Sequence, residues 1–201
     1  MKNDTILIIG NGESTTKQKL GNYINQYNKI ARINNYELDG YEKYLGNKTD
    51  IWINGANSKL KKRSQYPEEI LVLMPSSIFI KRNHNIENYV SSRLNLDKKK
   101  FKVVPKDEII RYEKIMNHDR LTTGLYAILW GLQYFNNVII YGFDCFIDSK
   151  THYFDSKIQR FFSSYIMRKG HKHNNKKEKE YIDKMVLNKT IKRLEDCHDQ
   201  R

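Results

Sequence analysis

Two short strings in the chain contain residue types that bind anions. Gly10-Asn11-Gly12 ends an apolar run and lacks the side chains that would keep a ligand away from backbone amides. Arg120-Leu121-Thr122-Thr123-Gly124 precedes a second apolar run, so it would place two hydroxyls, free amides and an arginine at the positive end of a helix. Taken alone, each string is more often an ordinary turn or an ordinary helix cap.

The histidines between residues 145 and 174 are candidates for acid–base chemistry. Histidines in Asn- and Lys-rich loops, such as His152, are usually solvated and inert. His173 differs because it stands two residues before Asn175, which with Glu178 forms an Asn-x-x-Glu helix-capping signature. A helix dipole disfavours the protonation of an imidazole that faces the helix N-terminus. The position therefore favours the neutral His173 that a general base requires.

The elements that would position these residues alternate between strands and helices. Continuous apolar runs predict strands buried on both faces, and apolar positions at spacings of three and four predict helices. Ser14 is expected to cap the first helix. We expect strands over 6–9, 30–33, 51–53, 70–74, 101–104 and 138–141, and helices after Ser14 and over 86–94, 107–115, 125–135 and 175–194.

This alternation predicts an α/β fold of the Rossmann-like kind, with a mostly parallel open sheet and helices on both faces. Ligands of such sheets bind outside the carboxyl ends of the strands. Four predicted strands end at Asn11, Asn34, Asn54 and Asp144, which should converge on one edge. The aromatic and basic stretch 145–174 has no clear period and predicts an active-site lid. No linker divides the chain, so a single domain over 1–201 is expected.

The overall composition indicates which cellular compartment and which kinds of partner to expect. The 201 residues carry a formal net charge of +13, which attracts polyanions, nucleotides, nucleotide-sugars and anionic lipid head groups alike. The lysine clusters lack interleaved aromatic residues, so no specific nucleic acid partner is expected. Two distant cysteines and the lack of an apolar run near ~20 residues predict a reducing compartment and no transmembrane segment. We expect a basic, cytoplasmic protein whose surface is compatible with peripheral membrane contact.

Several strings, taken together and in order, resemble motifs of the sialyltransferases. The resemblance reaches from residue 6 to about residue 181 and draws on both the bacterial and the eukaryotic-type families. The bacterial patterns are matched by Gly10 to Ser14, Arg32-Ile33-Asn34, Asn54, Arg120 to Gly124 and Gly142 to Asp144, and the eukaryotic-type patterns by His152 to Asp155 and His173-x4-Glu178.

The resemblance implies a metal-independent, inverting glycosyltransferase that moves sialic acid, or a related sugar, from a CMP-activated donor to a glycan hydroxyl. No cofactor or metal is expected, because hydrogen bonds can stabilise the single charged phosphate of departing CMP. His173 would be the general base, and His152 and Tyr153 would bind the leaving phosphate. The resemblance assigns nucleotide and sugar binding to Gly10, Asn11, Gly12, Ser14, Asn34, Asn54, Arg120, Thr122, Thr123, Gly124, Gly142, Asp144 and Tyr165.

The chain departs from the bacterial pattern at two positions. Phe146 stands where that family carries a phosphate-binding tyrosine, and Thr123 replaces a serine. Stabilisation of the leaving group would therefore rest on His152, Tyr153 or Tyr165.

Two other function classes stay open at the level of sequence. A pterin pyrophosphokinase-like α/β enzyme shares the glycine turn and the Gly-x-Asp strand end, and it would differ in needing a metal and binding ATP. A non-catalytic binding protein, either a degenerate transferase or a basic nucleic-acid module, would bind oligonucleotides in a strongly salt-dependent way without binding CMP.

Overall fold

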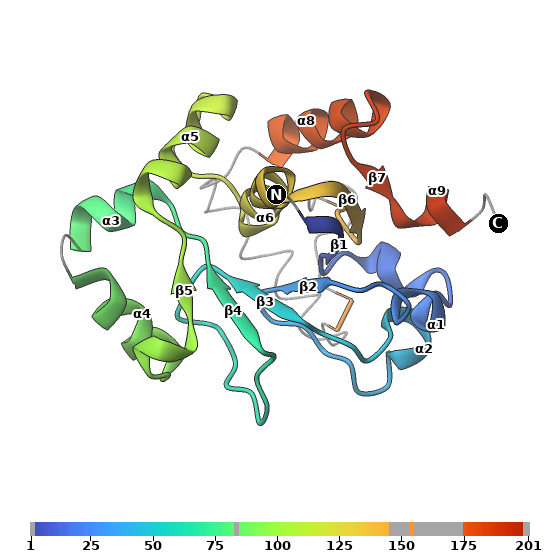
Figure 1. Ribbon diagram of the computed structural model, residues 1–201, viewed down its shortest axis with the longest axis horizontal. Helices are drawn as coiled ribbons and strands as arrows, with labels where there is room; N and C mark the ends of the chain where they lie inside the picture. The colour runs from blue at the N-terminus through green and yellow to red at the C-terminus, as the bar shows by residue number, and fades with distance from the viewer. Residues whose placement is uncertain (1–2, 83–84, 145–152, 155–174, 199–201) are drawn as a thin grey trace, which may run out of the picture.

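A single parallel sheet organises the computed structural model, which describes residues 3–82, 85–144, 153–154 and 175–198 (Figure 1). The strand order is β5-β4-β3-β2-β1-β6-β7, and every neighbouring pair is parallel. The predicted α/β class and parallel sheet are confirmed. The strands are β1 (Asn3–Ile9), β2 (Ile30–Ile33), β3 (Ile51–Asn54), β4 (Glu69–Val72), β5 (Lys102–Val103), β6 (Phe135–Tyr141) and β7 (Lys192–Arg193).

Helices cover both faces of the sheet, as the alternating sequence pattern predicts. One face packs against α5, α6 and α8, and the other packs against α1, α2 and α9 at one end and α4 at the opposite end. The helices are α1 (Gly21–Ile24), α2 (Glu42–Leu45), α3 (Ser76–Arg82), α4 (Ile86–Leu94), α5 (Lys106–Met116), α6 (Thr123–Tyr134), α8 (Asn175–Leu187) and α9 (Leu194–His198), with 3-10 turns η1 (Glu13–Thr16) and η3 (Lys98–Lys100).

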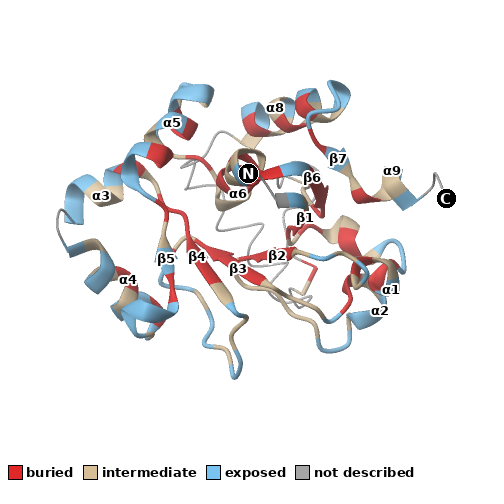
Figure 2. Ribbon diagram, viewed as in Figure 1, coloured by how far each residue is buried: buried red, intermediate tan, exposed pale blue. Residues whose placement is uncertain are grey.

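The strands are buried on both sides because their side chains alternate between two apolar layers. Ile6 and Ile8 of β1 join the layer under α6, whereas Leu7 and Ile9 join the layer under α1. Figure 2 shows the resulting burial along β2 and β3, whose residues are all buried. The continuous apolar runs in the sequence thus reflect a two-sided core.

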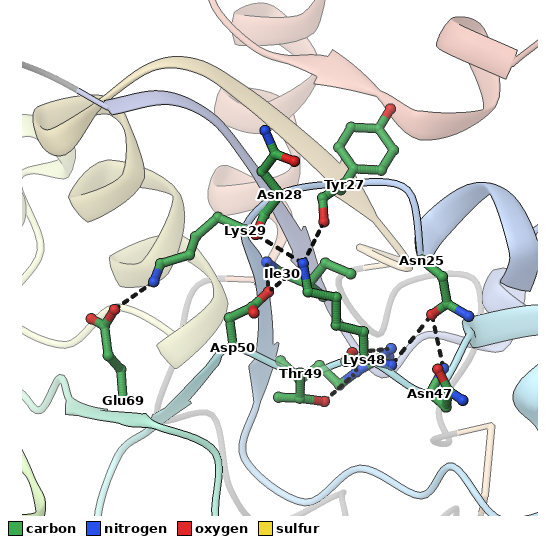
Figure 3. Close-up of polar contacts among 11 residues, drawn as sticks. Asn25, Tyr27, Asn28, Lys29, Ile30, Asn47, Lys48, Thr49, Asp50 and Glu69 are labelled. Atoms are coloured by element: carbon green, nitrogen blue, oxygen red, sulfur yellow. Dashed lines mark hydrogen bonds and ion pairs between the residues drawn. The ribbon is translucent and has the colours of Figure 1, made fainter.

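Polar contacts fix the amino ends of the central strands (Figure 3). The Asp50 carboxylate accepts a 2.8 Å hydrogen bond from the Ile30 amide, and Lys29 forms a 2.6 Å ion pair with Glu69. The Lys48 ammonium donates to the Tyr27 carbonyl at 2.8 Å. These contacts align β2, β3 and β4 at the edge opposite to the polar strand ends.

Two predicted helices are wrong in their details. Ser14 does not cap a helix: it lies inside η1, whose cap is Gly12, and α1 begins only at Gly21. The predicted helix over 175–194 ends at Leu187, because Lys189 adopts a left-handed conformation with φ 57° and the Thr190 amide donates to the Met185 carbonyl. The chain then forms β7 and α9, and neither these two elements nor α2 and α3 are predicted from the sequence.

Most of the predicted lid lies outside the described residues. Of the stretch 145–174, the structure describes Tyr153 and Phe154, so the lid stays a prediction. Among the helices of the described part of the chain, none is long and apolar enough to cross a membrane.

Candidate active site

The carboxyl ends of four adjacent parallel strands form the edge at which a ligand is expected. β1 lies between β2 and β6, so the chain leaves β1 toward one side of the sheet and returns through β6 on the other (Figure 1). This is the topological switch point where open α/β sheets bind ligands. The loops after β1, β2, β3 and β6 therefore meet at one edge, as the sequence predicts for Asn11, Asn34, Asn54 and Asp144.

Glycines allow the loops after β1 and β6 to pack in direct contact. The Gly10 amide donates to the Tyr141 carbonyl at 2.8 Å, and the Gly12 amide donates to the Gly142 carbonyl at 3.0 Å. A Cβ atom at Gly10 would lie 2.4 Å from the Gly142 oxygen. The expected exposure of amides to an anion therefore does not hold for Gly10 and Gly12, whose N–H groups bond within the protein.

Asp144 fastens the two loops to each other. Its carboxylate accepts a 3.0 Å hydrogen bond from the Ser14 amide and a second one from the Ser14 hydroxyl. A Cβ atom at Gly12 would lie 2.3 Å from the Asp144 carboxyl carbon, so glycine is required where the carboxylate crosses the turn. The contacts indicate that Ser14 and Asp144 shape the edge of the sheet.

Two asparagines present unpaired polar atoms at this edge. Asn11 donates through Nδ2 to the Ile33 carbonyl at 2.8 Å, and its buried Oδ1 has no hydrogen-bond partner among the described residues. Asn54 is fully buried, and its Oδ1 accepts from the Ala56 amide at 3.0 Å. Its Nδ2 has no partner within the described part of the chain. Buried polar atoms are normally paired, so these two are exceptions among the described residues of this edge.

Asn34 and Arg32 have structural partners. Asn34 has a left-handed backbone with φ 52°, and its Oδ1 accepts from the Gly55 amide at 3.2 Å. The buried Arg32 guanidinium donates to the Leu45 carbonyl at 2.6 Å and to the Thr49 hydroxyl at 2.9 Å. Burial lowers the pKa of Arg32 to about 10. These contacts tie the buried Arg32 side chain to neighbouring loops. Arg32 therefore stabilises the structure around the site and is not placed to bind a ligand.

The start of α6 lies against the same strand ends. Thr122 caps the helix, and its hydroxyl accepts a 3.2 Å hydrogen bond from the Leu125 amide. A Cβ atom at Gly55 would lie 3.1 Å from the Thr123 hydroxyl, and one at Gly124 would lie 3.1 Å from the Phe143 ring. The predicted anion-binding helix start is thereby brought beside the loops after β3 and β6.

Glu178 joins α8 to this helix start. Its carboxylate accepts from the Thr122 amide at 2.9 Å and from the Thr122 hydroxyl at 2.5 Å, and the residue is 3% exposed. The predicted Asn-x-x-Glu cap is wrong, because Asn175 is already helical and the carboxylate faces Thr122. Burial is the main cause that raises the pKa of Glu178 above its ordinary value. The two sequence motifs that contain Thr122 and Glu178 thus form one physical unit.

Tyr153 is anchored beside Asn11. Its hydroxyl donates to the Glu37 carbonyl at 2.5 Å and accepts from the Glu37 amide at 2.8 Å, while its own amide donates to the Asn11 carbonyl at 3.2 Å. The side chain is buried, and this burial raises the pKa of Tyr153 to about 12. Its role at the leaving phosphate stays a prediction, although these contacts favour a positioning role.

The remaining sequence-predicted residues divide into two groups. Arg120 is described, and its amide donates to His118 Nδ1 at 3.2 Å just before the helix start. His152, Tyr165 and His173 lie outside the described residues, so their roles stay predictions.

A buried carboxylate that the sequence analysis missed supports the helix start from behind. Glu113 accepts from the Tyr126 hydroxyl at 2.6 Å and from the Ser76 amide at 2.9 Å, and the Leu121 amide donates to the Tyr126 hydroxyl at 3.4 Å. In the sequence, Glu113 is one of several charged residues in an amphipathic helix pattern. Nothing in that pattern distinguishes a buried glutamate from one that faces solvent.

The fold is a parallel α/β scaffold whose loops meet at the switch point. Residues 4–190 match the family model described as glycosyltransferase family 29 (sialyltransferase), and the chain belongs to this family. The predicted family resemblance is therefore confirmed.

Two known sialyltransferases are similar to this chain, one over nearly its whole length and one over about a third of it. The lactosylceramide alpha-2,3-sialyltransferase of Rattus norvegicus is 23% identical over 220 residues, covering 94% of this chain and 56% of the relative. The CMP-N-acetylneuraminate-beta-1,4-galactoside alpha-2,3-sialyltransferase of Homo sapiens is 29% identical over 68 residues, covering 34% of this chain and 18% of the relative. The chain therefore spans about half the length of the first relative and less of the second.

A solved structure has the same fold. A mammalian sialyltransferase in complex with Gal-beta-1-3GalNAc-ortho-nitrophenol superimposes with a TM-score of 0.69 at 15% identity, covering 96% of this chain and 69% of that one. The likeness supports the arrangement of the sheet and helices.

The contacts of the Tyr153 hydroxyl predict the behaviour of Tyr153→Phe. The substitution keeps the ring but leaves the amide and carbonyl of Glu37 unpaired, so we expect the free energy of unfolding in urea to fall by about 1–3 kcal/mol. The affinity for CMP should change less than about twofold. Tyr44→Phe, in the same apolar cluster, is the control and should leave both quantities unchanged. Weaker CMP binding without loss of stability would instead indicate that the phenol binds the nucleotide.

The raised pKa of Glu178 predicts a pH dependence. A carboxyl whose folded pKa exceeds its unfolded pKa contributes stability below the unfolded pKa and loses it as the pH rises through the folded pKa. Relative to wild type, Glu178→Gln should therefore gain free energy of unfolding as the pH rises from about 4 to about 7. Urea unfolding at both pH values measures the difference. The exposed Glu180→Gln is the control, and a difference for Glu178→Gln that falls with pH contradicts the prediction.

Proposed function

We propose that this chain transfers sialic acid, or a closely related sugar, from a CMP-activated donor to a hydroxyl of a glycan. The proposal covers the whole activity, including donor, acceptor and the inversion of configuration at the anomeric carbon. Membership of the family supports the reaction class. The relatives' names refer to alpha-2,3-sialyltransferases, which supports the same donor sugar here.

The contact between Glu178 and Thr122 carries the proposal. It ties the helix that follows His173 in the chain to the helix start that faces the switch point. A nucleotide at this edge would lie beside the loops that carry Asn11 and Asn54 and beside the hydroxyl of Thr123. The arrangement suits a small polar ligand with several hydrogen-bonding groups, such as CMP.

The proposed reaction is a single displacement. The oxygen of the acceptor hydroxyl forms a bond to the anomeric carbon of the donor sugar while the bond from that carbon to the CMP phosphate oxygen breaks. His173 takes the hydroxyl proton as the new bond forms, since a neutral imidazole with a pKa of about 6.5 is a suitable acceptor at neutral pH. Hydrogen bonds at the helix start would stabilise the negative charge that develops on departing CMP.

Two further properties belong to the same proposal. The enzyme would need no metal or cofactor, because CMP departs with one phosphate whose charge hydrogen bonds can stabilise. It would act in the cytoplasm, as the composition suggests. The comparisons support neither a pterin pyrophosphokinase-like enzyme nor a non-catalytic basic binding protein.

The proposed base predicts different effects on activity when either of two neighbouring histidines is replaced by alanine. His173→Ala should lower kcat for transfer from CMP-sialic acid by on the order of 10²-fold or more, because proton removal from the acceptor is lost. The dissociation constant for CMP should be nearly unchanged. His171→Ala is the matched control from the same basic stretch and should keep its activity.

Two results would contradict this assignment. An inactive His171→Ala beside an active His173→Ala would move the base to His171. Full activity in both variants would remove the histidine base from the mechanism.

A further inference from the structure

A cavity of about 510 Å³ lies beside the candidate active site. It is an open cavity bordered by the loop that follows β2, by Asn47 and Thr49 before β3, by the loop that connects β3 to β4, and by Phe154. Its size falls in the range of small-molecule sites. Its lining includes six aromatic and cationic side chains: Tyr36, Lys61, Lys62, Arg63, Tyr66 and Phe154.

The walls of this cavity are fixed before any ligand binds. The Arg63 guanidinium carbon lies 3.5 Å from the centre of the Tyr36 ring, and its Nη2 donates to the carbonyls of Asn34 and Tyr36 at 3.3 Å each. The Asn35 side chain accepts from the Lys61 amide at 2.8 Å and donates to the Lys59 carbonyl at 3.0 Å. The two loops are thereby tied together, so binding a ligand would cost little further conformational entropy in these loops.

Charges of opposite sign come from the two loops. Lys61, Lys62 and Arg63 come from the loop between β3 and β4, and Glu37 and Asp39 come from the loop after β2. Among the described residues, none of the three cations forms an ion pair. Cations that form no direct ion pair attract a carboxylate, carboxylates accept hydrogen bonds from sugar hydroxyls, and aromatic faces pack against sugar rings. Together these features fit an acidic sugar.

One residue, Asn34, links the wall of the cavity to the candidate active site. The Asn34 carbonyl holds Arg63 in the cavity wall, while the Asn34 side chain binds Gly55 at the strand ends. From there the cavity reaches Asn47 and Thr49, which precede β3 and lie away from the carboxyl edge. A ligand in the cavity would therefore extend away from the nucleotide site, as an acceptor does.

We propose that this cavity binds the acceptor and that the acceptor carries a carboxylate-bearing sugar. The proposal rests on the transferase function proposed above and names its acceptor class. The carboxylate pairs with Lys61 and Lys62, and the sugar ring packs against Tyr66 and Phe154. One acceptor hydroxyl then faces the donor at the edge of the sheet.

Binding of two sugars that differ in one charge tests the proposal. Lactose and lactose that bears one sialic acid are titrated calorimetrically into the full chain at low salt. We expect the acidic sugar to bind at least about fivefold tighter than lactose. The double variant Lys61→Ala/Lys62→Ala should lose about fivefold in affinity for the acidic sugar and keep its affinity for lactose and CMP. Lys98→Ala/Lys99→Ala, in exposed η3, is the matched control and should resemble wild type.

Four outcomes separate a failure of this proposal from a failure of the function on which it rests. Equal binding of the two sugars, or a double variant that binds the acidic sugar as wild type does, overturns the proposal. The proposal is also overturned if the double variant binds a non-hydrolysable CMP-sialic acid analogue more weakly than wild type does and binds the acidic sugar normally. The cavity would then hold the donor sugar. If wild type binds the acidic sugar preferentially but does not bind CMP, the acidic-sugar site stands and the proposed transferase function fails.

Discussion

The hydrogen bonds from Thr122 to the buried Glu178 carboxylate are the interaction on which the candidate active site depends. They fix the first turn of α6, whose Thr123 hydroxyl lies beside Gly55 at the strand ends, to the first turn of α8. A buried carboxylate is costly unless it is hydrogen-bonded, so the contact holds the two helices in one relative position. Residues that are 56 positions apart in the chain are thereby held at one end of the sheet.

The strand-end loops are constrained just as closely. Gly10, Gly12 and Gly142 let the loops after β1 and β6 touch, and Asp144 links them through Ser14. The amides of Gly10, Gly12 and Ser14 bond within the protein, and Asn11 Oδ1 and Asn54 Nδ2 are among the buried atoms without a partner in the described residues. A rigid edge with few open polar groups is well suited to position a ligand before reaction, which is how much of an enzyme's rate advantage arises.

The sequence predicts the elements that bury apolar runs on both faces and misses those set by backbone geometry. β2, β3 and α4 lie where their apolar patterns place them, because two-sided burial leaves a continuous signal. The end of α8 was missed because a left-handed lysine, Lys189, terminates it without glycine or proline. For the site, strand ends indicate Asn11 and Asn54, but the partner of Glu178 is a tertiary contact that local capping rules cannot reveal.

A crystal structure of the chain with CMP tests the central claim most directly. The account predicts that CMP occupies the carboxyl edge between β1 and β6, where it contacts Asn11 and the first turn of α6. The Glu178 carboxylate should still accept both hydrogen bonds from Thr122. CMP bound in the cavity lined by Lys61 and Lys62, or at the edge without contact to α6, would contradict the account.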